Sequence, residues 1–555
     1  MKERYISLMA KVLTAYSDEH IVAYFDRVKK EGLTEHGFPR MAANIGILIS
    51  HGYRKDLLPL FIEMMSFCCH EIPRVKAAND FSVREIVFCL IEVEAAGIVG
   101  DEQLAKWKAD IASIDPYTCY DKFAKTPKDR VFNWALFTTV SEYVRQYYGL
   151  CDSREFIDIQ IPTQLQWIDE NGMYRDALYH PPIMYDLVPR TLFSLLLHFG
   201  YNGKYRDDID AVLRKADQLT LKMLSVTGEV AFGGRSNQFL HNEAMLLTIL
   251  EFAANRYKKE GNLELAGKFK AAVVRAIEHL EGWLDKTPIY HVKNRFPLET
   301  QYGCEVYAYF DKYMITVASN LHSAYMVCDD TIEVGEFDIS PMAFKTSDEF
   351  NKLFLRAGGY ALEFDTDADP HYDASGLGRV HKIGMPSALC MSLPCPAMPK
   401  FVVGEHPVAM SLCPGIFSDN YWQFATDAYI GRYELLDMGN GESSAHASLL
   451  CRFFNGKEVK TAYTVDENGV TIKATSSDKL AHMLPAFTFD GETHTDIKLS
   501  DRQLEIHYQG SVCRYTVNGK IIDLDEIGYN RNGHYRGFAV IGDKELEIKI
   551  ELVKE

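Results

Sequence analysis

The chain contains the segment Gly233-Gly234-Arg235-Ser236-Asn237-Gln238-Phe239-Leu240-His241-Asn242-Glu243, which leads directly into an almost wholly apolar run at residues 244–254. A helix that is apolar nearly all round is a buried helix. Its polar residues are confined to the first two turns, so only that end can meet solvent or a ligand. The paired glycines let the backbone turn tightly into the helix, and Ser236 or Asn237 can cap it. The sequence therefore predicts a buried helix over residues 237–255.

The start of this helix also has the features of an anion site. Free backbone N–H groups and the positive end of the helix dipole favour a negative charge there, and Arg235 adds a cation. The same residues are equally consistent with a capped, buried helix whose polar groups are satisfied internally. The residues alone leave both interpretations open.

Residues 1–286 show the apolar spacing of one helix after another, with short connections and no convincing strand. The predicted helices span residues 6–29, 39–52, 57–69, 82–96, 103–114, 131–148, 155–167, 189–199, 207–224, 237–255 and 263–284. Apolar helices alternate with amphipathic ones, which favours an (α/α) toroid with the apolar helices inside. Periodicity alone also allows an irregular bundle or a solenoid.

After about Lys286 the pattern changes to period two. Predicted strands are 304–310, 313–319, 360–364, 463–465, 470–474, 504–508 and 546–552. Turn signals such as Asn455-Gly456 and Asn518-Gly519 separate several of them. Many short strands predict an antiparallel β-sandwich over residues 287–555. No low-complexity linker precedes it, so we expect the toroid and the sandwich to pack firmly.

Composition excludes several classes of partner and site. The formal net charge of −18 over 555 residues argues against nucleic-acid and anionic-membrane partners. The first residues are too broken by charge for a signal peptide, and no apolar stretch is long enough to span a bilayer. The twelve cysteines form no CxxC motif, and no metal-ligand spacing is present. These features predict a cytoplasmic protein with reduced thiols and no metal.

Polar residues gather at further predicted helix starts. Asn133-Trp134 lie near one start, Tyr174 and Asp176 precede another, and Tyr185-Asp186 come just before Pro189-Arg190. Proline fits the first turn of a helix, so a start at Pro189 would let Asp186 and Arg190 pair across it. A cap with a surface salt bridge explains the pair equally well. Helix starts of neighbouring hairpins in a toroid share one rim, where the aromatic rings could stack on sugar faces.

A polar, glycine-rich cluster also occurs in the predicted sandwich, at residues 369–382. It carries Arg379 and His381 and has the character of a long loop over a site. It lacks the lysine and following helix of a phosphate-binding loop. An ordinary excursion between strands is the alternative.

The layout resembles that of enzymes that combine an (α/α) toroid with a β-sandwich and act on uronic-acid glycans. The residues that carry the resemblance are Asn133-Trp134, Gly172 to Asp176, Tyr185-Asp186, Pro189-Arg190 and Gly233 to Ser236. The chain is similar to glycoside hydrolase family 154, the β-glucuronidase-like family, and shares its architecture with the heparinase II/III-like polysaccharide lyases. The resemblance implies a cleft between toroid rim and sandwich, a uronate-bearing oligosaccharide as substrate and no organic cofactor. The oligomeric state stays open, a homo-oligomer included.

An exo-acting glycosidase of this kind needs two carboxyl groups that flank the bond. We expect Glu243 and Asp186 to form that pair, with Asp176 in reserve. Arg235 and Arg190 would hold the uronate carboxylate. The other candidate substrate-binding residues are Asn237, Gln238, Asn242, Asn133, Trp134, Tyr174, His381 and Arg379. Hydrolysis is the reaction that the sequence favours.

A lyase instead removes the proton beside the uronate carboxyl and expels the glycosidic oxygen, which requires a base, an acid and a group that neutralises the carboxylate. Tyr185, His241, Asn242 and His381 could fill those roles. His241 and Glu243 lie two residues apart, so they face nearly opposite sides of one helix and cannot both reach the cleft. A sugar-binding protein without catalysis is a third interpretation.

Overall fold

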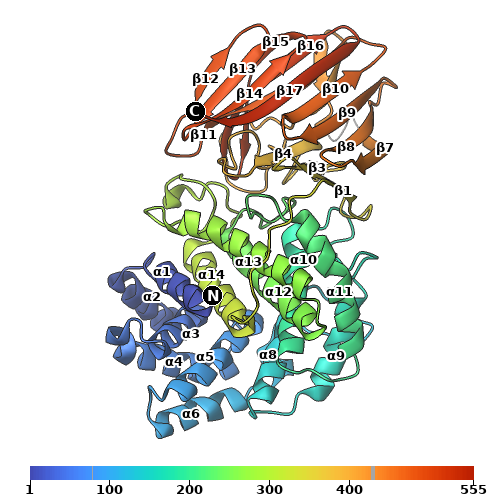
Figure 1. Ribbon diagram of the computed structural model, residues 1–555. Coiled ribbons are helices and arrows are strands. Elements are labelled where there is room, and N and C mark those ends of the chain that lie inside the picture. Colours follow the sequence, from blue (N-terminus) through green and yellow to red (C-terminus); the bar gives the residue numbers. More distant parts are fainter. Residues whose placement is uncertain (78, 427–431) are drawn as a thin grey trace.

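The computed structural model describes residues 1–77, 79–426 and 432–555 (Figure 1). Within those ranges the α-helices all precede the strands along the chain. The helical part and the sheets form two bodies that meet along one face, shown in Figure 1 as the blue-to-yellow and orange-to-red regions. The predicted fold class, an N-terminal (α/α) toroid followed by a C-terminal antiparallel β-sandwich, is confirmed.

The helices that the structure describes are mostly 12 to 22 residues long. They are α1 Lys2–Leu13, α2 Asp18–Glu31, α3 Gly37–Ser50, α4 Leu58–Glu71, α5 Val83–Ala96, α6 Asp101–Ala112, α7 Pro116–Cys119, α8 Trp134–Tyr147, α9 Arg154–Leu165, α10 Ile183–His198, α11 Arg206–Met223, α12 Leu240–Lys259, α13 Leu263–Leu284 and α14 Phe310–Val327. Short 3₁₀ turns lie at Lys55–Leu57, Ile72–Arg74, Asn79–Phe81 and Leu298–Thr300.

Six of these helices close into a ring. The order around the ring is α3, α5, α8, α10, α12 and α14, and α14 packs back against α3. These inner helices are buried nearly all round: in α3 every residue from Gly37 to Ile49 is buried. Outer helices such as α11 bury one face and carry charge on the other, as the amphipathic pattern requires. The alternation of the two helix types therefore predicts the toroid correctly.

The helical part extends beyond the boundary predicted at residue 286. Residues 304–310 and 313–319, predicted as strands, form a loop and part of α14, and the first strand begins only at Met342. The prediction was wrong because α14 is buried on all sides from Met314 to Ala324. A fully buried helix and a fully buried strand both appear as continuous apolar runs, which periodicity cannot distinguish.

Several other predicted helix bounds differ from the structure. The span 6–29 is two helices, because the side chain of Ser17 accepts a hydrogen bond from the His20 N–H at 3.1 Å and starts α2. α10 begins at Ile183 and continues through Pro189, so Tyr185 and Asp186 lie within its first turn rather than before it. The central helix α12 begins at Leu240, three residues later than predicted.

The strands pair antiparallel throughout the described residues. Their bounds are β1 Met342–Lys345, β2 Lys352–Ala357, β3 Tyr360–Asp365, β4 Gly376–Lys382, β5 Pro414–Ser418, β6 Tyr421–Phe424, β7 Arg432–Asn440, β8 Ala445–Arg452, β9 Glu458–Asp466, β10 Gly469–Thr475, β11 Leu480–Phe489, β12 Asp496–Leu499, β13 Gln503–Tyr508, β14 Ser511–Val517, β15 Lys520–Asn530, β16 Gly533–Gly542 and β17 Glu545–Lys554. They form sheets ordered β1-β2-β3-β4, β12-β13-β14-β17-β10-β9-β8-β7 and β15-β16-β11-β5-β6.

The toroid and the sandwich share a small apolar core. Phe350 and Phe354 of the sandwich pack with Met173, Ile183 and other side chains of the helical part. Strand β2, which carries Phe354, is buried along its whole length. This shared core agrees with the firm packing expected from the absence of a linker.

Two further features are the state of the cysteines and the apolar character of the helices. All twelve cysteines are free thiols, and eleven of them are buried. Burial raises the pKa of the Cys119 thiol to about 12, so that thiol stays protonated and unreactive. Among the helices described, none has the length and apolar character needed to cross a bilayer.

Candidate active site

A cavity of about 490 Å³ lies inside the ring of inner helices, at the rim where these helices start. Every inner helix contributes to its lining from its first turns or from the residues just before it. The polar and aromatic members of the lining include Glu35, His36, Arg40, Arg84, Asn133, Trp134, Tyr185, Arg235, His241, Tyr307, Lys312, Tyr313 and Asn320. The toroid thus brings together helix starts that are far apart in sequence.

The segment 232–239 crosses this rim in an irregular conformation. The residues with positive φ are Gly233, Gly234, Ser236 and Gln238. The left-handed region costs a non-glycine residue about 1–3 kcal/mol, so the surrounding contacts must hold Ser236 and Gln238 there. A chain in this conformation cannot continue the helix toward its N-terminus. For that reason α12 starts at Leu240 without the side-chain cap predicted at Ser236 or Asn237.

Three backbone N–H groups of this segment donate hydrogen bonds to buried carboxylates. The pairs are Phe232 with Glu363 at 3.2 Å, Gly234 with Asp373 at 2.7 Å and Ser236 with Glu305 at 2.7 Å. Glu363 lies on β3 and Asp373 on the loop after it, so two of the three acids come from the sandwich. The protein itself therefore supplies negative charge close to where the sequence predicted an anion site.

Arg235 extends from this segment into the cavity. Its guanidinium pairs with Asp176 and lies 4.3 Å from the centre of the Tyr185 ring, and its side chain is 39% exposed. Asn133 donates to the other oxygen of Asp176 at 2.6 Å. Burial raises the pKa of Asp176, and its hydrogen bonds to Asn133 and Arg235 oppose that shift. Arg235 is thus a fixed, accessible cation.

Two tyrosines meet one serine hydroxyl beside Arg235. Ser236 Oγ lies 3.2 Å from the Tyr185 hydroxyl and 2.8 Å from the Tyr307 hydroxyl. Burial raises the pKa of both tyrosines, although Arg235 opposes the shift at each. Both phenols are therefore protonated at neutral pH and can donate a proton or a hydrogen bond.

His241 lines the same cavity from the first turn of α12. Its side chain is buried, and its Nδ1 atom has no hydrogen-bond partner. Burial lowers the pKa of His241 to about 3, with Arg40 contributing. The imidazole is therefore neutral at neutral pH, and one of its two ring nitrogens carries no proton.

The lining carries an excess of positive charge. Its cations are Arg40, Arg84, Arg235 and Lys312, whereas Glu35 is its one carboxylate among the residues described. Glu85 and Asp176 pair with these cations from behind the lining, and the cations still outnumber the acids. In a protein with a net charge of −18, such a local excess favours an anionic ligand.

The two carboxyls expected to form a catalytic pair lie outside this lining. Glu243 is fully buried and accepts from Lys293 Nζ at 2.5 Å. Asp186 is also buried, pairs with Arg190 at 2.7 Å and accepts from the Tyr174 N–H at 2.8 Å. The predicted Asp186–Arg190 pair is confirmed, but as a buried ion pair rather than a surface one. Catalytic roles for both carboxyls stay predictions.

The three amides proposed to bind hydroxyls bond instead to their own segment. Asn237 donates to the Ala231 carbonyl at 3.2 Å, and Gln238 donates to Asn237 at 2.7 Å. Asn242 donates to the Ser236 carbonyl at 3.1 Å. All three are buried and lie outside the lining, so in this structure they hold the rim segment in place.

The other substrate-binding candidates divide between the cavity and its surroundings. Asn133 and Trp134 line the cavity, whereas Tyr174 is buried beneath it and donates to Gln164 at 2.9 Å. Half of the predicted loop 369–382 is strand β4, on which Arg379 and His381 are buried. These two face Glu363 and Ser225 instead of the cavity.

Sequence reasoning missed His36, Tyr307 and Tyr313. The two tyrosines fell in stretches predicted as strands, so their position at the start of a helix was hidden. His36 directly precedes α3 and lies 2.8 Å from Arg40. Proline is favoured in the first turn of a helix, so Pro39 indicates that the helix starts slightly earlier in the chain, next to His36.

Asp373 is predicted to make protein stability depend on pH. Burial raises the pKa of its carboxyl to about 6, and Lys352 opposes that shift. The folded state therefore holds this proton more tightly than the unfolded chain, whose Asp pKa is about 3.9. The contribution is fully present below about pH 4 and is lost as the pH rises through about 6.

Asp373→Asn should flatten this dependence. Between about pH 4 and 7 its free energy of unfolding should fall by about 3 kcal/mol less than that of the wild type. Urea unfolding across that pH range measures the difference, with Asp369→Asn on the same loop as control. Parallel pH profiles for wild type and Asp373→Asn would refute the assignment.

Comparisons with known proteins find similarity only among solved structures. No protein-family model matches the sequence, and no curated protein matches it. A heparan sulfate lyase from Pedobacter heparinus is similar with a TM-score of 0.41 and 10% identity, over 93% of this chain and 76% of that one. A glycosyl hydrolase of family 88 from Bacteroides vulgatus has a TM-score of 0.40 and 13% identity, over 59% of this chain and 99% of that one. With TM-scores below 0.5, these similarities do not identify a reaction.

Proposed function

We propose that the protein is a carbohydrate-active enzyme that cleaves uronate-bearing oligosaccharides in the toroid cavity, by β-elimination. The observation that carries the proposal is the contacting group of Arg235, Tyr185, Ser236 and Tyr307, together with His241 in the lining of the same cavity. It combines an accessible cation, two protonated phenols and a neutral imidazole. Elimination beside a carboxylate needs these three kinds of group.

Each group has a defined part in the reaction. Arg235 holds the uronate carboxylate and stabilises the charge that develops when the neighbouring C5–H bond breaks. His241 accepts that proton. The electron pair forms the C4–C5 double bond, the C4–O bond breaks, and Tyr307 or Tyr185 gives a proton to the departing oxygen. The products are an unsaturated uronate and a saccharide with a free hydroxyl.

The same cavity is poorly equipped for hydrolysis, which the sequence favoured. A glycosidase places two carboxyl groups about 5–9.5 Å apart on either side of the bond. Glu35 is the one carboxyl in the described lining, and it already accepts hydrogen bonds from Tyr24 and the Gly37 N–H. Glu243 and Asp186 are each engaged in a buried ion pair. These contacts support elimination over hydrolysis.

The size of the cavity supports a short substrate. Its volume of about 490 Å³ lies in the lower half of the range of about 300–1,000 Å³ for small-molecule sites. Trp134 lines the cavity, and its ring centroid lies 4.7 Å from that of Phe81 in a T-shaped arrangement. We propose that one or two sugar rings fill the cavity, which favours action at chain ends.

A paired assay tests the proposal. Two sets of di- and tetrasaccharides are incubated with the enzyme, one whose uronate carries a sugar on O4, as elimination requires, and one capped by a non-reducing-end uronate, as an exo-hydrolase requires. Ultraviolet absorbance follows the unsaturated uronate, and a second assay follows free saturated uronic acid. We expect absorbance to rise without release of saturated uronic acid. Release of saturated acid at constant absorbance would establish hydrolysis instead. Binding without either product would favour a sugar-binding protein.

A further inference from the structure

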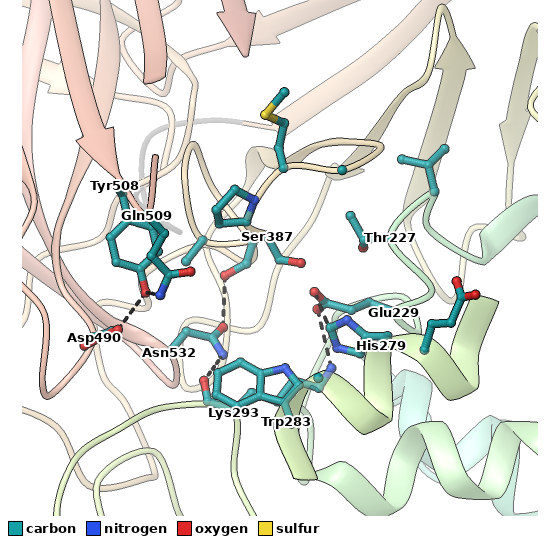
Figure 2. A pocket seen from close by; sticks show the side chains of 18 of the residues that line it. Thr227, Glu229, His279, Trp283, Lys293, Ser387, Asp490, Tyr508, Gln509 and Asn532 are labelled. Carbon is teal, nitrogen blue, oxygen red and sulfur yellow. Dashed lines mark hydrogen bonds and ion pairs between the residues drawn. The ribbon is translucent and has the colours of Figure 1, made fainter. Parts of the chain in front are cut away.

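A second cavity, of about 330 Å³, lies between α13 and the sandwich (Figure 2). Its lining shares no residue with that of the toroid cavity. In Figure 2, Glu229 and His279 lie on one side, whereas Asp490, Tyr508 and Gln509 of the sandwich lie on the other. The proposed reaction makes no use of this cavity.

One wall carries buried charged groups with unused hydrogen-bonding capacity. Glu229 Oε2 lies 3.4 Å from Lys293 Nζ, and Glu229 Oε1 lies 3.7 Å from His279 Nε2. His279 Nε2 has no hydrogen-bond partner, although its side chain is only 9% exposed. Burial opposes ionisation of Glu229, but Lys293 and His279 outweigh it and hold the pKa of Glu229 well below its usual range. Glu229 and His279 both line the cavity, so this wall carries a carboxylate and an imidazole.

Lys286, a cation in the same lining, favours an anionic group on the ligand. Its Nζ atom lies 3.6 Å from the centre of the Trp283 ring, and it forms no ion pair with the residues described. Burial lowers the pKa of Lys286 and Arg295 adds to that shift, whereas Asp490 and Glu492 oppose it without forming an ion pair with the ammonium. A ligand carboxylate would supply the missing partner.

The sandwich wall adds a carboxylate, a phenol and amides, and no further cation among the residues described. Asp490 accepts from the Tyr508 hydroxyl at 2.6 Å, and Gln509 donates to that same hydroxyl at 2.9 Å. Asn532 donates to the Lys293 carbonyl at 2.6 Å. Amides, phenols and carboxylates of this kind bind hydroxyls, and the other two cations of the lining, Arg275 and Lys293, are already paired with carboxylates.

We propose that this cavity binds a sugar acid of one or two rings, with its carboxylate at Lys286 and its hydroxyls at Glu229, His279 and Gln509. The volume of about 330 Å³ lies at the lower end of the range for small ligands, about 300–1,000 Å³. Sugar acids are also the product class of the proposed reaction, and that link alone rests on the proposed function. The site itself is inferred from its lining residues and does not depend on the proposed reaction.

Gly282 provides a way to fill the cavity without disturbing the fold. It lies on α13 in the lining, and a Cβ atom built there meets no heavy atom within 4 Å. A larger residue at a helical glycine also favours the helix. Gly282→Leu should therefore occupy the cavity in a folded protein, with Gly282→Ala as the matched control that leaves most of the space open.

The test is calorimetric titration with D-glucuronic acid, with D-glucose and inorganic phosphate as comparison ligands. Arg235→Gln, which disables the toroid cavity, should retain one glucuronate site. Adding Gly282→Leu to that variant should abolish binding, whereas adding Gly282→Ala should preserve it. Adding Lys286→Gln should weaken binding by about tenfold or more, the effect of losing a hydrogen bond to a charged group.

Three results would overturn the site. They are no glucuronate binding to Arg235→Gln at millimolar concentration, binding that survives Gly282→Leu, and phosphate or glucose binding at least as tight as glucuronate. The result of this binding test is independent of the result of the turnover assay that tests the proposed function. If no saccharide is turned over but Gly282→Leu removes glucuronate binding, the enzyme proposal fails and the site remains.

Discussion

His241→Gln is expected to lower kcat/KM for a uronate-bearing oligosaccharide by about 10²–10⁴-fold, the usual contribution of a positioned acid or base. The imidazole lines the cavity and is neutral, so one of its ring nitrogens carries no proton, and its buried Nδ1 atom has no hydrogen-bond partner. Glutamine can donate and accept hydrogen bonds but cannot take up the proton. Initial rates of absorbance increase, with circular dichroism to verify folding, measure the effect.

Glu243→Gln is the matched control, because it lies two residues away on the same helix. It faces Lys293 instead of the cavity. We expect its rate to stay within a few-fold of wild type, while its stability falls because Lys293 retains only Glu229, at 3.4 Å. A large rate loss in Glu243→Gln together with near-normal turnover in His241→Gln would reverse the assignment and favour hydrolysis.

The toroid was predictable because its signal is local. Inner helices such as α3 and α12 are apolar around almost their whole circumference, and outer helices such as α11 are two-faced. Each of these properties can be recognised from the sequence of a single helix. The end of the helical part was not predictable in this way, since α14 is buried all round from Met314 to Ala324, polar residues included, and has no exposed polar face there to reveal its period.

Much of the candidate site was visible in the sequence as polar residues at helix starts. Asn133, Trp134, Tyr185, Arg235 and His241 all line the cavity. Their partners were not visible, because those contacts join residues far apart in the chain.

The hydroxyl of Ser236 meets that of Tyr307, 71 residues away. The Gly234 N–H donates to Asp373, 139 residues away. Sequence patterns indicate which residues are polar and near a helix start. Tertiary contacts decide which of these residues are already engaged in hydrogen bonds or ion pairs within the fold. Glu243 and Asp186 illustrate this, since each meets a buried cation that lies behind the rim.

The sandwich has a part in this site although it contributes none of the cavity lining. Glu363 and Asp373 hold two N–H groups of the segment that carries Arg235. The toroid therefore provides the cavity, and the sandwich fixes the conformation of the segment on its rim. This arrangement explains how Ser236 and Gln238 can be kept in the left-handed region.

Arg235→Gln is expected to lower kcat/KM by about 10²–10³-fold, as removal of a group that stabilises developing charge does. Arg235 is the accessible cation nearest the two phenols, through its 4.3 Å contact with the Tyr185 ring. Arg235→Lys keeps the charge but loses the planar fork that binds a carboxylate through two bonds, so its rate should lie between those of wild type and Arg235→Gln. Arg175→Gln is the control, because Arg175 is bound to Glu349 at 2.9 Å and lies outside the lining.

The substitution also leaves Asp176 buried without its cation, which would raise the pKa of that carboxyl further. A loss of activity could then come from misfolding rather than from the missing charge. The double variant Arg235→Gln/Asp176→Asn separates the two causes, because it removes the unpaired acid along with the cation. We expect the double variant to recover stability in urea unfolding while its rate stays at the level of Arg235→Gln. Recovery of the rate as well would show that Arg235 acts only by neutralising Asp176, and the carboxylate of the substrate would then need another partner.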